Sequence, residues 1–112
     1  MYDLIIVGGG PAGAAAAVYA ARKQLKTLMM VEEWGGQSNV SPDIQNWVGT
    51  KSISGADLAK SLREHAESHV ADEMLEMRAP VSAQSLAVLD DHVTVTLKDG
   101  SSVDAKTLFI AT

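Results

Sequence analysis

The sequence contains no cysteine among its 112 residues, and only 4% of the residues are aromatic. The absence of cysteine excludes disulfides, thiolate metal sites and a dithiol redox centre within this chain. Basic residues are also few, since nine lysines and arginines stand against 14 acidic residues and give a formal net charge of −5. This charge argues against nucleic acids and anionic membranes as partners. Hydrophobic residues make up 46% and charged residues 21%, which is typical of one folded globular domain and excludes a disordered chain.

One uncharged stretch, from Leu4 to Ala21, approaches the length of a membrane span. Several glycines and a proline interrupt it, and these residues break a long apolar helix. Only Asp3 carries a charge ahead of the stretch, whereas a signal peptide begins with basic residues. We therefore interpret it as a buried strand, a turn and a small-residue helix, and we predict neither a membrane segment nor a targeting peptide.

The first half of the chain alternates between strand and helix patterns. Residues 2–7 and 25–31 are short apolar runs typical of parallel strands that are buried on both faces. Residues 13–23, between them, are rich in alanine and predict a helix. Residues 32–52 contain many turn-forming residues and predict a long loop of the kind that carries function. These features together predict an α/β fold.

The second half begins with a helix and ends with strands. Ser54, followed three residues later by Asp57, predicts a capped helix whose apolar stripe ends at Val70. Residues 74–77 predict a third strand. An antiparallel β-meander is expected over residues 81–103, because apolar residues alternate with polar ones and turn residues separate the runs. Residues 107–111 are again largely apolar and predict a buried strand that returns to the parallel sheet.

The glycine-rich turn after the first strand carries the chemical signal. Residues 8–13, Gly-Gly-Gly-Pro-Ala-Gly, contain the pattern G-x-G-x-x-G between a buried strand and a helix, which is the context of a dinucleotide-binding site. Gly8 allows the tight turn, Gly10 lets a diphosphate approach the backbone, and Gly13 lets the helix pack against the strand. Glu32 follows about 20 residues further on, where an acid accepts hydrogen bonds from ribose hydroxyls. This pattern alone does not separate FAD from NAD(P), since both contain ADP.

Further motifs, spread over the whole chain, narrow the choice. They are Val18-Tyr-Ala-Ala-Arg22, Gly35-Gly-Gln37, Asp43-Ile-Gln-Asn-Trp-Val-Gly49, Ser54-Gly55 and Leu108-Phe-Ile-Ala-Thr112. Together with the glycine-rich turn, they resemble the N-terminal FAD-binding segment of the thioredoxin reductase family, to which the flavoprotein subunit of alkyl hydroperoxide reductase is closely related. The resemblance implies a Rossmann-like, three-layer FAD-binding domain in which a parallel sheet with helices also carries an antiparallel β-meander.

The resemblance also implies where FAD lies. Gly10, Pro11 and Ala12 would line the pyrophosphate, and Glu32 would bind the adenosine ribose. Other contacts would come from the loop, from Arg78 through its backbone to adenine, and from the last strand. The expected cofactor-binding residues are Gly8, Gly10, Pro11, Ala12, Gly13, Glu32, Glu33, Gly36, Gln37, Asn46 (near the flavin ring), Arg78, Ala111 and Thr112. No residue of this chain is expected to be catalytic or to bind a metal.

Members of that family continue beyond the strand that matches residues 108–112. They add an NAD(P)H domain with a Cys-x-x-Cys centre and then return to complete the FAD domain. Residues 1–112 are therefore expected to be a truncated, N-terminal part of an FAD-binding domain. The full-length enzyme would pass electrons from NAD(P)H through FAD to a disulfide, with a thioredoxin-like protein as a partner. We also expect a cytoplasmic protein that forms homo-oligomers.

Two alternatives remain open at this point. The first alternative to the expected enzyme segment is a stand-alone FAD-binding module without turnover, and the second is a small NAD(P)-binding Rossmann domain of a dehydrogenase or regulator. The Gly35-Gly-Gln37 loop argues against the second alternative, because it resembles flavin sites.

Three other features require an interpretation. The spacing of His65 and His69 suits a metal ion, but their polar neighbours favour a solvated helix face. For Trp47, contact with the flavin region and coverage of apolar surface are equally good interpretations. Trp34 is expected to cover apolar surface.

Overall fold

One mixed sheet of six strands, in the order β3-β2-β1-β6-β5-β4, organises the computed structural model, which describes residues 1–112. Four strands are mutually parallel, and β5 and β4 extend the sheet in antiparallel fashion. The strands are β1 (Tyr2–Gly9), β2 (Thr27–Trp34), β3 (Leu75–Arg78), β4 (Ala83–Val88), β5 (Val93–Leu97) and β6 (Ser102–Ile110). The helices are α1 (Pro11–Arg22), α2 (Gly55–Glu67) and the short 3₁₀ helices η1 (Gly36–Val40) and η2 (Val70–Asp72).

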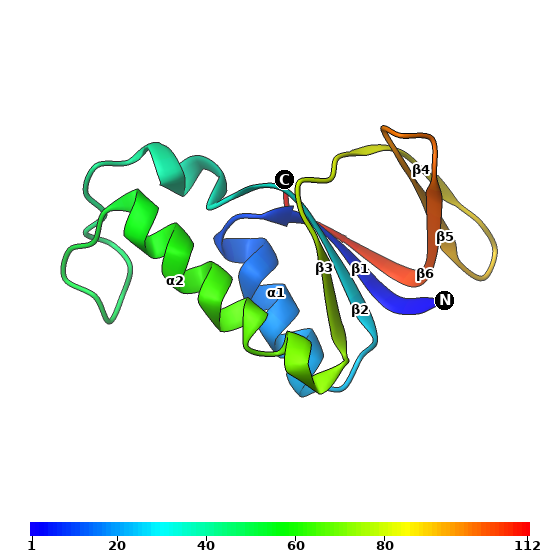
Figure 1. Cartoon of the computed structure of the whole chain (residues 1–112), viewed down its shortest axis with the longest axis horizontal. Helices are drawn as coiled ribbons and strands as arrows, with labels where there is room; N and C mark the ends of the chain where they lie inside the picture. The colour runs from blue at the N-terminus through cyan, green and yellow to red at the C-terminus, as the bar shows by residue number, and fades with distance from the viewer.

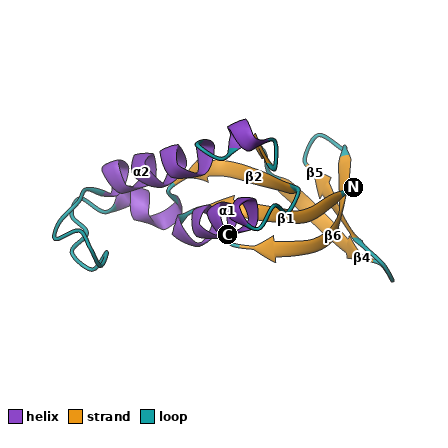
Figure 2. Ribbon diagram, turned by 90° about the horizontal axis from the view of Figure 1, so that it is seen from below, coloured by secondary structure: helices purple, strands orange, loops and turns teal.

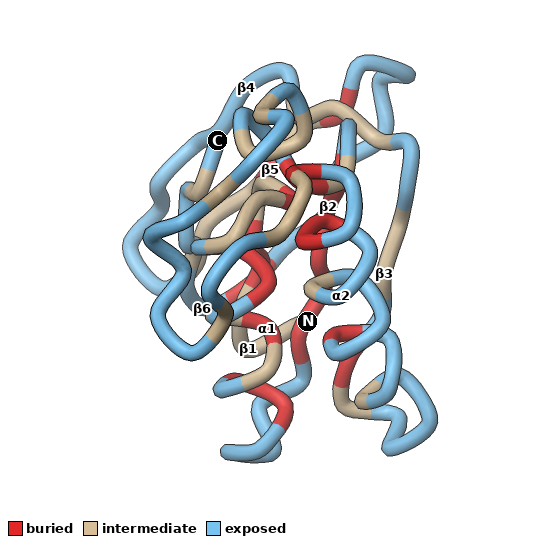
Figure 3. Tube along the Cα trace, turned by 90° about the vertical axis from the view of Figure 1, so that its left-hand side faces the viewer, coloured by how far each residue is buried: buried red, intermediate tan, exposed pale blue.

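The molecule has three layers, as expected for the three-layer domain. Figures 1 and 2 show α1 and α2 side by side on one face of the parallel strands, and the β4–β5 hairpin at the opposite side. Each face has its own apolar cluster. Ile6, Met29 and Val31 pack toward the helices, whereas Ile5, Leu28 and Met30 pack toward β5. Buried residues are accordingly concentrated in β1, β2 and the inner faces of the helices (Figure 3).

Small side chains and a polar cap explain the two long helices. Ala14, Ala17 and Ala21 form the buried stripe of α1, and alanine allows the helix axis to lie close to the sheet. Helix α2 begins where Ser54 predicts it, because the Ser54 hydroxyl accepts a hydrogen bond of 3.1 Å from the amide of Asp57. Residues 4–21 form a strand, a turn and a helix, as interpreted from the sequence. No helix in the chain is long and apolar enough to cross a membrane.

Four predicted boundaries or environments were wrong. Strand β2 begins at Thr27 and continues through Trp34, so that the start of the expected loop is extended backbone paired with β1. Helix α2 ends at Glu67, and Val70 is an exposed residue of η2. The meander and the returning strand, predicted as separate elements over residues 81–103 and 107–111, share the single strand β6 (Ser102–Ile110). Its end is not buried, since Phe109 and Ile110 are 43% and 61% exposed.

The turn between β1 and α1 brings three backbone segments into close contact. A Cβ atom added to Gly8, whose φ is +126°, would lie 2.1 Å from the carbonyl oxygen of Ala111. A Cβ atom added to Gly13 would lie 2.1 Å from the carbonyl oxygen of Gly8. At Gly10, by contrast, an added Cβ would have no atom nearer than 3.9 Å. Two of these glycines are therefore required by packing, whereas Gly10 borders open space.

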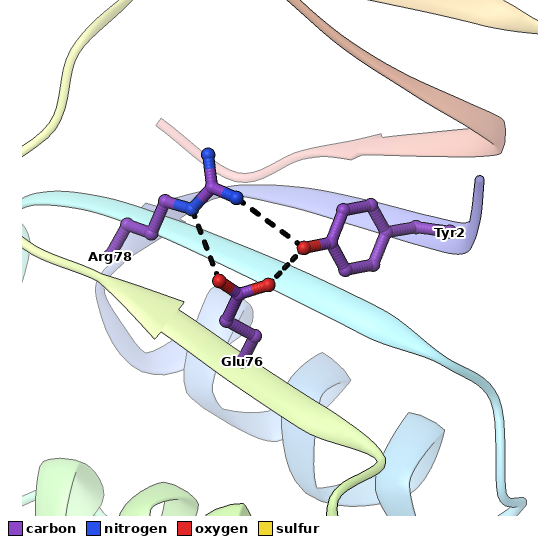
Figure 4. A network of polar contacts seen from close by, with 3 residues as sticks. All are labelled: Tyr2, Glu76 and Arg78. Atoms are coloured by element: carbon purple, nitrogen blue, oxygen red, sulfur yellow. Dashed lines mark hydrogen bonds and ion pairs between the residues drawn. The ribbon is translucent and has the colours of Figure 1, made fainter.

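At the opposite end of β1, a polar network joins β1 to β3 across β2. The Tyr2 hydroxyl donates a hydrogen bond to the Glu76 carboxylate, and the Arg78 guanidinium lies 3.3 Å from that carboxylate and 3.4 Å from the Tyr2 hydroxyl (Figure 4). The hydrogen bond from Tyr2 is the main reason that the pKa of Glu76 is lowered. Burial, followed by the same hydrogen bond, raises the pKa of Tyr2. The network stabilises the pairing of the edge strand β3.

Replacing Gly13 by alanine is expected to destabilise the fold by about 3 kcal/mol, because a methyl group must displace a backbone carbonyl. Replacing Gly10 is expected to cost less than about 1 kcal/mol, which is the loss of a favourable N-cap residue. Urea unfolding of both variants measures these values. Equal destabilisation by G10A and G13A would contradict the packing that we describe.

Replacing Tyr2 by phenylalanine is expected to reduce the free energy of unfolding at pH 7 by about 1 kcal/mol, a low value because Glu76 is half exposed. Folding lowers the pKa of Glu76, so its contribution is present above the ordinary pKa of 4.5 and is lost as the pH falls through the folded-state value. Stability should therefore fall less steeply with acid in Y2F than in the wild type. The exposed Tyr19 provides the control, and identical acid slopes for Y2F, Y19F and the wild type would refute this role.

Candidate dinucleotide-binding site

A cleft of about 510 Å³ opens at the carboxyl ends of β1 and β2. In parallel α/β sheets, this edge is where ligands bind, and the volume suits a small-molecule site. The β1–α1 turn forms its floor, the β2–η1 segment forms one wall, and the residues after β3 and β6 complete it. The lining residues are Val7, Gly8, Gly9, Gly10, Pro11, Ala12, Met30, Glu32, Glu33, Gly36, Gln37, Ser38, Val81, Ser82, Ala83, Ala111 and Thr112.

Most residues predicted from the sequence come together in this cleft. Those that line it are Gly8, Gly10, Pro11, Ala12, Glu32, Glu33, Gly36, Gln37, Ala111 and Thr112. Gly13 lies directly beneath, where its contact with Gly8 holds α1 against the strand. Asn46 and Arg78 do not line the cleft. The Arg78 side chain is engaged with Glu76 and Tyr2, and Asn46 is exposed on the loop beyond η1.

Backbone amides at the starts of two helices give the cleft its chemistry. The amide of Ala14 donates to the carbonyl of Gly10 over 3.0 Å, whereas the amides of Ala12 and Gly13 lie in the first turn of α1, where a helix offers no internal acceptor. The amides of Gly36 and Gln37 lie likewise at the start of η1. Such donors, together with the positive end of the α1 dipole, favour an anionic group. The open space at Gly10 lets that group approach the backbone.

Two carboxylates occupy the other side of the cleft. Glu32 and Glu33 are consecutive residues near the end of β2, and both are exposed. No other charged side chain lines the cleft. The Lys98 ammonium lies beside the first of them, with its Nζ 4.0 Å from Oε1 of Glu32. Carboxylates in this position accept hydrogen bonds from hydroxyl groups and repel phosphate, so they suit the ribose end of a nucleotide.

Several lining residues were not predicted from the sequence. Val7, Gly9, Met30 and Ser38 are neighbours of predicted residues along the chain, and the glycine spacing gives no reason to include them. The segment from Val81 to Ala83 reaches the cleft because the amide of Val81 donates to the carbonyl of Val31 over 2.9 Å. No sequence motif marks this segment, and its position depends on contacts formed only in the folded chain.

The loop beyond η1 extends away from the cleft. Residues 41–54 lie at the end of the molecule opposite the β4–β5 hairpin (Figure 1), and a single bridge joins Ile44 to Ile53. Trp47 is on this loop and does not line the cleft. Trp34, as expected, packs beside the core cluster, and its ring lies 5.8 Å from the Arg63 guanidinium.

His65 lies in α2, and His69 immediately precedes η2. The rings of His65 and His69 lie 5.9 Å apart, and His69 faces Asp72 at 3.6 Å. No group of three histidine, cysteine or carboxylate side chains in the chain is arranged to hold a metal ion. His65 is exposed, whereas the His69 side chain is only 20% exposed, so the expected solvated face holds for the first histidine alone.

The geometry suits a dinucleotide. A diphosphate would meet the amides in the first turn of α1 and the open space at Gly10, and a ribose would meet Glu32. Gly10 has no Cβ atom that could block this approach. The Cβ positions of Gly8 and Gly13 face the backbones of Ala111 and Gly8 instead of open space. The residues present therefore fit a dinucleotide cofactor with its diphosphate at the start of α1.

Comparison with known proteins identifies the family. The family described as pyridine nucleotide-disulphide oxidoreductase matches residues 2–112. The F subunit of alkyl hydroperoxide reductase from Staphylococcus aureus (strain NCTC 8325 / PS 47) is 37% identical over 111 residues, which cover 99% of this chain and 21% of that protein. The chain thus spans about a fifth of the length of this curated relative.

Solved thioredoxin reductases have the same fold over the whole chain. The enzyme of Lactococcus lactis, in its FR conformation, superposes with a TM-score of 0.91 and 32% identity, covering 100% of this chain and 35% of that one. The enzyme of Streptococcus pyogenes MGAS5005 superposes with a TM-score of 0.87 and 37% identity over the same shares. The expected resemblance and fold are confirmed, and the chain belongs to the pyridine nucleotide-disulphide oxidoreductase family, with the fold of its thioredoxin reductases.

Proposed function

We propose that residues 1–112 form the FAD-binding portion of a thioredoxin-reductase-like flavin oxidoreductase. The observation that carries this proposal is the convergence of the glycine-rich turn, Glu32 and the Gly36–Gln37 segment on one cleft. The amides of Ala12, Gly13, Gly36 and Gln37 would hold the FAD pyrophosphate. Glu32 and Glu33 would bind the adenosine ribose, and Ala111 and Thr112 would lie beneath the cofactor at the end of β6.

The division of the cleft indicates which half of FAD this chain recognises. The amides and carboxylates line one compact site, whereas Asn46, expected near the flavin ring, lies outside it. The chain therefore makes most of its contacts with the ADP half of the cofactor. FAD, when bound, supplies two-electron redox chemistry at its flavin ring. This chain orients the cofactor from the adenosine end and leaves the ring accessible to other parts of the enzyme.

The complete enzyme would pass electrons from NAD(P)H through FAD to a disulfide. A thiol pair for this step must come from outside residues 1–112, because the chain contains no cysteine. A thioredoxin-like disulfide protein as partner, homo-oligomer formation and a cytoplasmic location are further parts of the proposal. The exposed apolar side chains of Leu86, Phe109 and Ile110 support self-association of this chain.

FAD is expected to bind the chain, with ADP as a competitor and FMN without effect, since FMN lacks the adenosine and its pyrophosphate. Replacing Gly10 by alanine should weaken FAD binding at least about 10-fold, because the methyl group enters the path of the diphosphate. Flavin fluorescence titration measures the affinities. The unfolding free energy of G10A serves as the control for folding. Unchanged FAD affinity in folded G10A, or equal binding of FMN, would contradict the proposed orientation.

Replacing Glu32 by glutamine should weaken ADP and FAD binding about 10-fold, the value of a hydrogen bond to a charged acceptor. NADPH should bind more weakly than FAD, because its 2′-phosphate would approach Glu32 and Glu33. In E32Q the difference between the affinities for FAD and NADPH should be smaller than in the wild type. Calorimetry with the wild type, E32Q and the remote control E64Q checks both expectations. NADPH binding tighter than FAD in the wild type would support an NAD(P)-binding domain instead.

A further inference from the structure

Lys98 lies in the turn between β5 and β6, far along the chain from the glycine-rich turn and Glu32. Hydrogen bonds fix its backbone at the cleft wall. The amide of Lys98 donates to the carbonyl of Ser82 over 3.1 Å, and Ser82 lines the cleft. The turn is closed by the amide of Leu97, which donates to the carbonyl of Ser101 over 2.8 Å. The base of the Lys98 side chain is thus held beside the cleft even though its end is free to move.

The Lys98 ammonium faces the acidic side of the cleft. Its Nζ lies 4.0 Å from Oε1 of Glu32, and the two side chains are 67% and 73% exposed. As an isolated surface pair, these groups would contribute little to stability. Their position gives them another effect, because Glu32 and Glu33 are the only charged side chains that line a cleft suited to an anionic diphosphate. Without a nearby cation, these carboxylates would repel the phosphates that the backbone amides attract.

We propose that Lys98 is a positioning residue for the dinucleotide, which it favours by neutralising Glu32 and holding its carboxylate at the ribose end of the cleft. This inference rests on the proposed function. Lys98 acts from the meander, so the antiparallel extension of the sheet contributes to cofactor affinity as well as to the core. The residue belongs to none of the motifs through which the sequence resembles its family.

Another ion pair in the chain provides a matched control. The Nζ of Lys60 also lies 4.0 Å from a glutamate oxygen, Oε1 of Glu64, and both side chains are exposed on α2. Neither residue lines the cleft. Replacing Lys60 by glutamine therefore removes the same charge from a similar pair. An effect specific to Lys98 cannot then be assigned to the change in net charge alone.

The experiment measures the affinity of the full chain for FAD and ADP at low and high ionic strength. We expect K98Q to raise the Kd roughly three- to ten-fold at low salt, since it removes one charge interaction near the rim of the cleft. The effect should vanish near 1 M salt, where the screening length is about 3 Å. K98R should bind like the wild type, because arginine retains the charge, and K60Q should also be unchanged.

A double-mutant cycle with E32Q tests whether Lys98 acts through Glu32. We expect K98Q to have a smaller effect in E32Q than in the wild type, because the repulsive charge is already absent. The inference would be overturned if K98Q and K60Q had equal affinities at low salt, or if the effect of K98Q were undiminished in E32Q. In either case, FAD binding by the wild type would still uphold the proposed function. Failure of the wild type to bind both FAD and ADP would instead overturn the proposed function, and this inference with it.

Discussion

The contact between the backbones of Gly8, Gly13 and Ala111 determines the geometry of the site. It places the first turn of α1 directly against the end of β1 and brings the end of β6 alongside. No side chain fits between these segments, so the amides at the start of α1 remain at the floor of a cleft instead of being covered. The parallel sheet and the alanine stripe of α1 serve this arrangement, because both let the helix and the strands approach closely.

Charge is divided within the cleft in a way that suits a nucleotide. The phosphate end is bordered by backbone amides, which carry partial positive charge without a basic side chain. The ribose end is bordered by carboxylates, with Lys98 beside one of them. Backbone donors have fixed positions and lose no side-chain entropy on binding. The same separation disfavours a ligand that carries phosphate at its ribose, which is how a site of this kind distinguishes between cofactors that share an adenosine.

The sequence was informative where a local pattern has one structural solution. The glycine spacing predicted the β1–α1 turn and its contacts, and Ser54 predicted the start of α2. The sequence was less informative where position depends on long-range contacts. Val81 and Ser82 reach the cleft through backbone hydrogen bonds that carry no residue preference. The apolar run at the end of β6 suggested burial, but strand hydrophobicity cannot show whether another layer covers the second face.

The most direct test follows the backbone amides by heteronuclear NMR while ADP is added to the chain. The amides of Ala12, Gly13, Gly36 and Gln37 lie at the helix starts that border the cleft, so a bound diphosphate should change their chemical shifts more than those of other amides. Adenosine, which lacks phosphate, should leave these four signals nearly unchanged. If ADP binds while these amides keep their shifts and those of a distant surface move, the proposed position of the diphosphate is wrong.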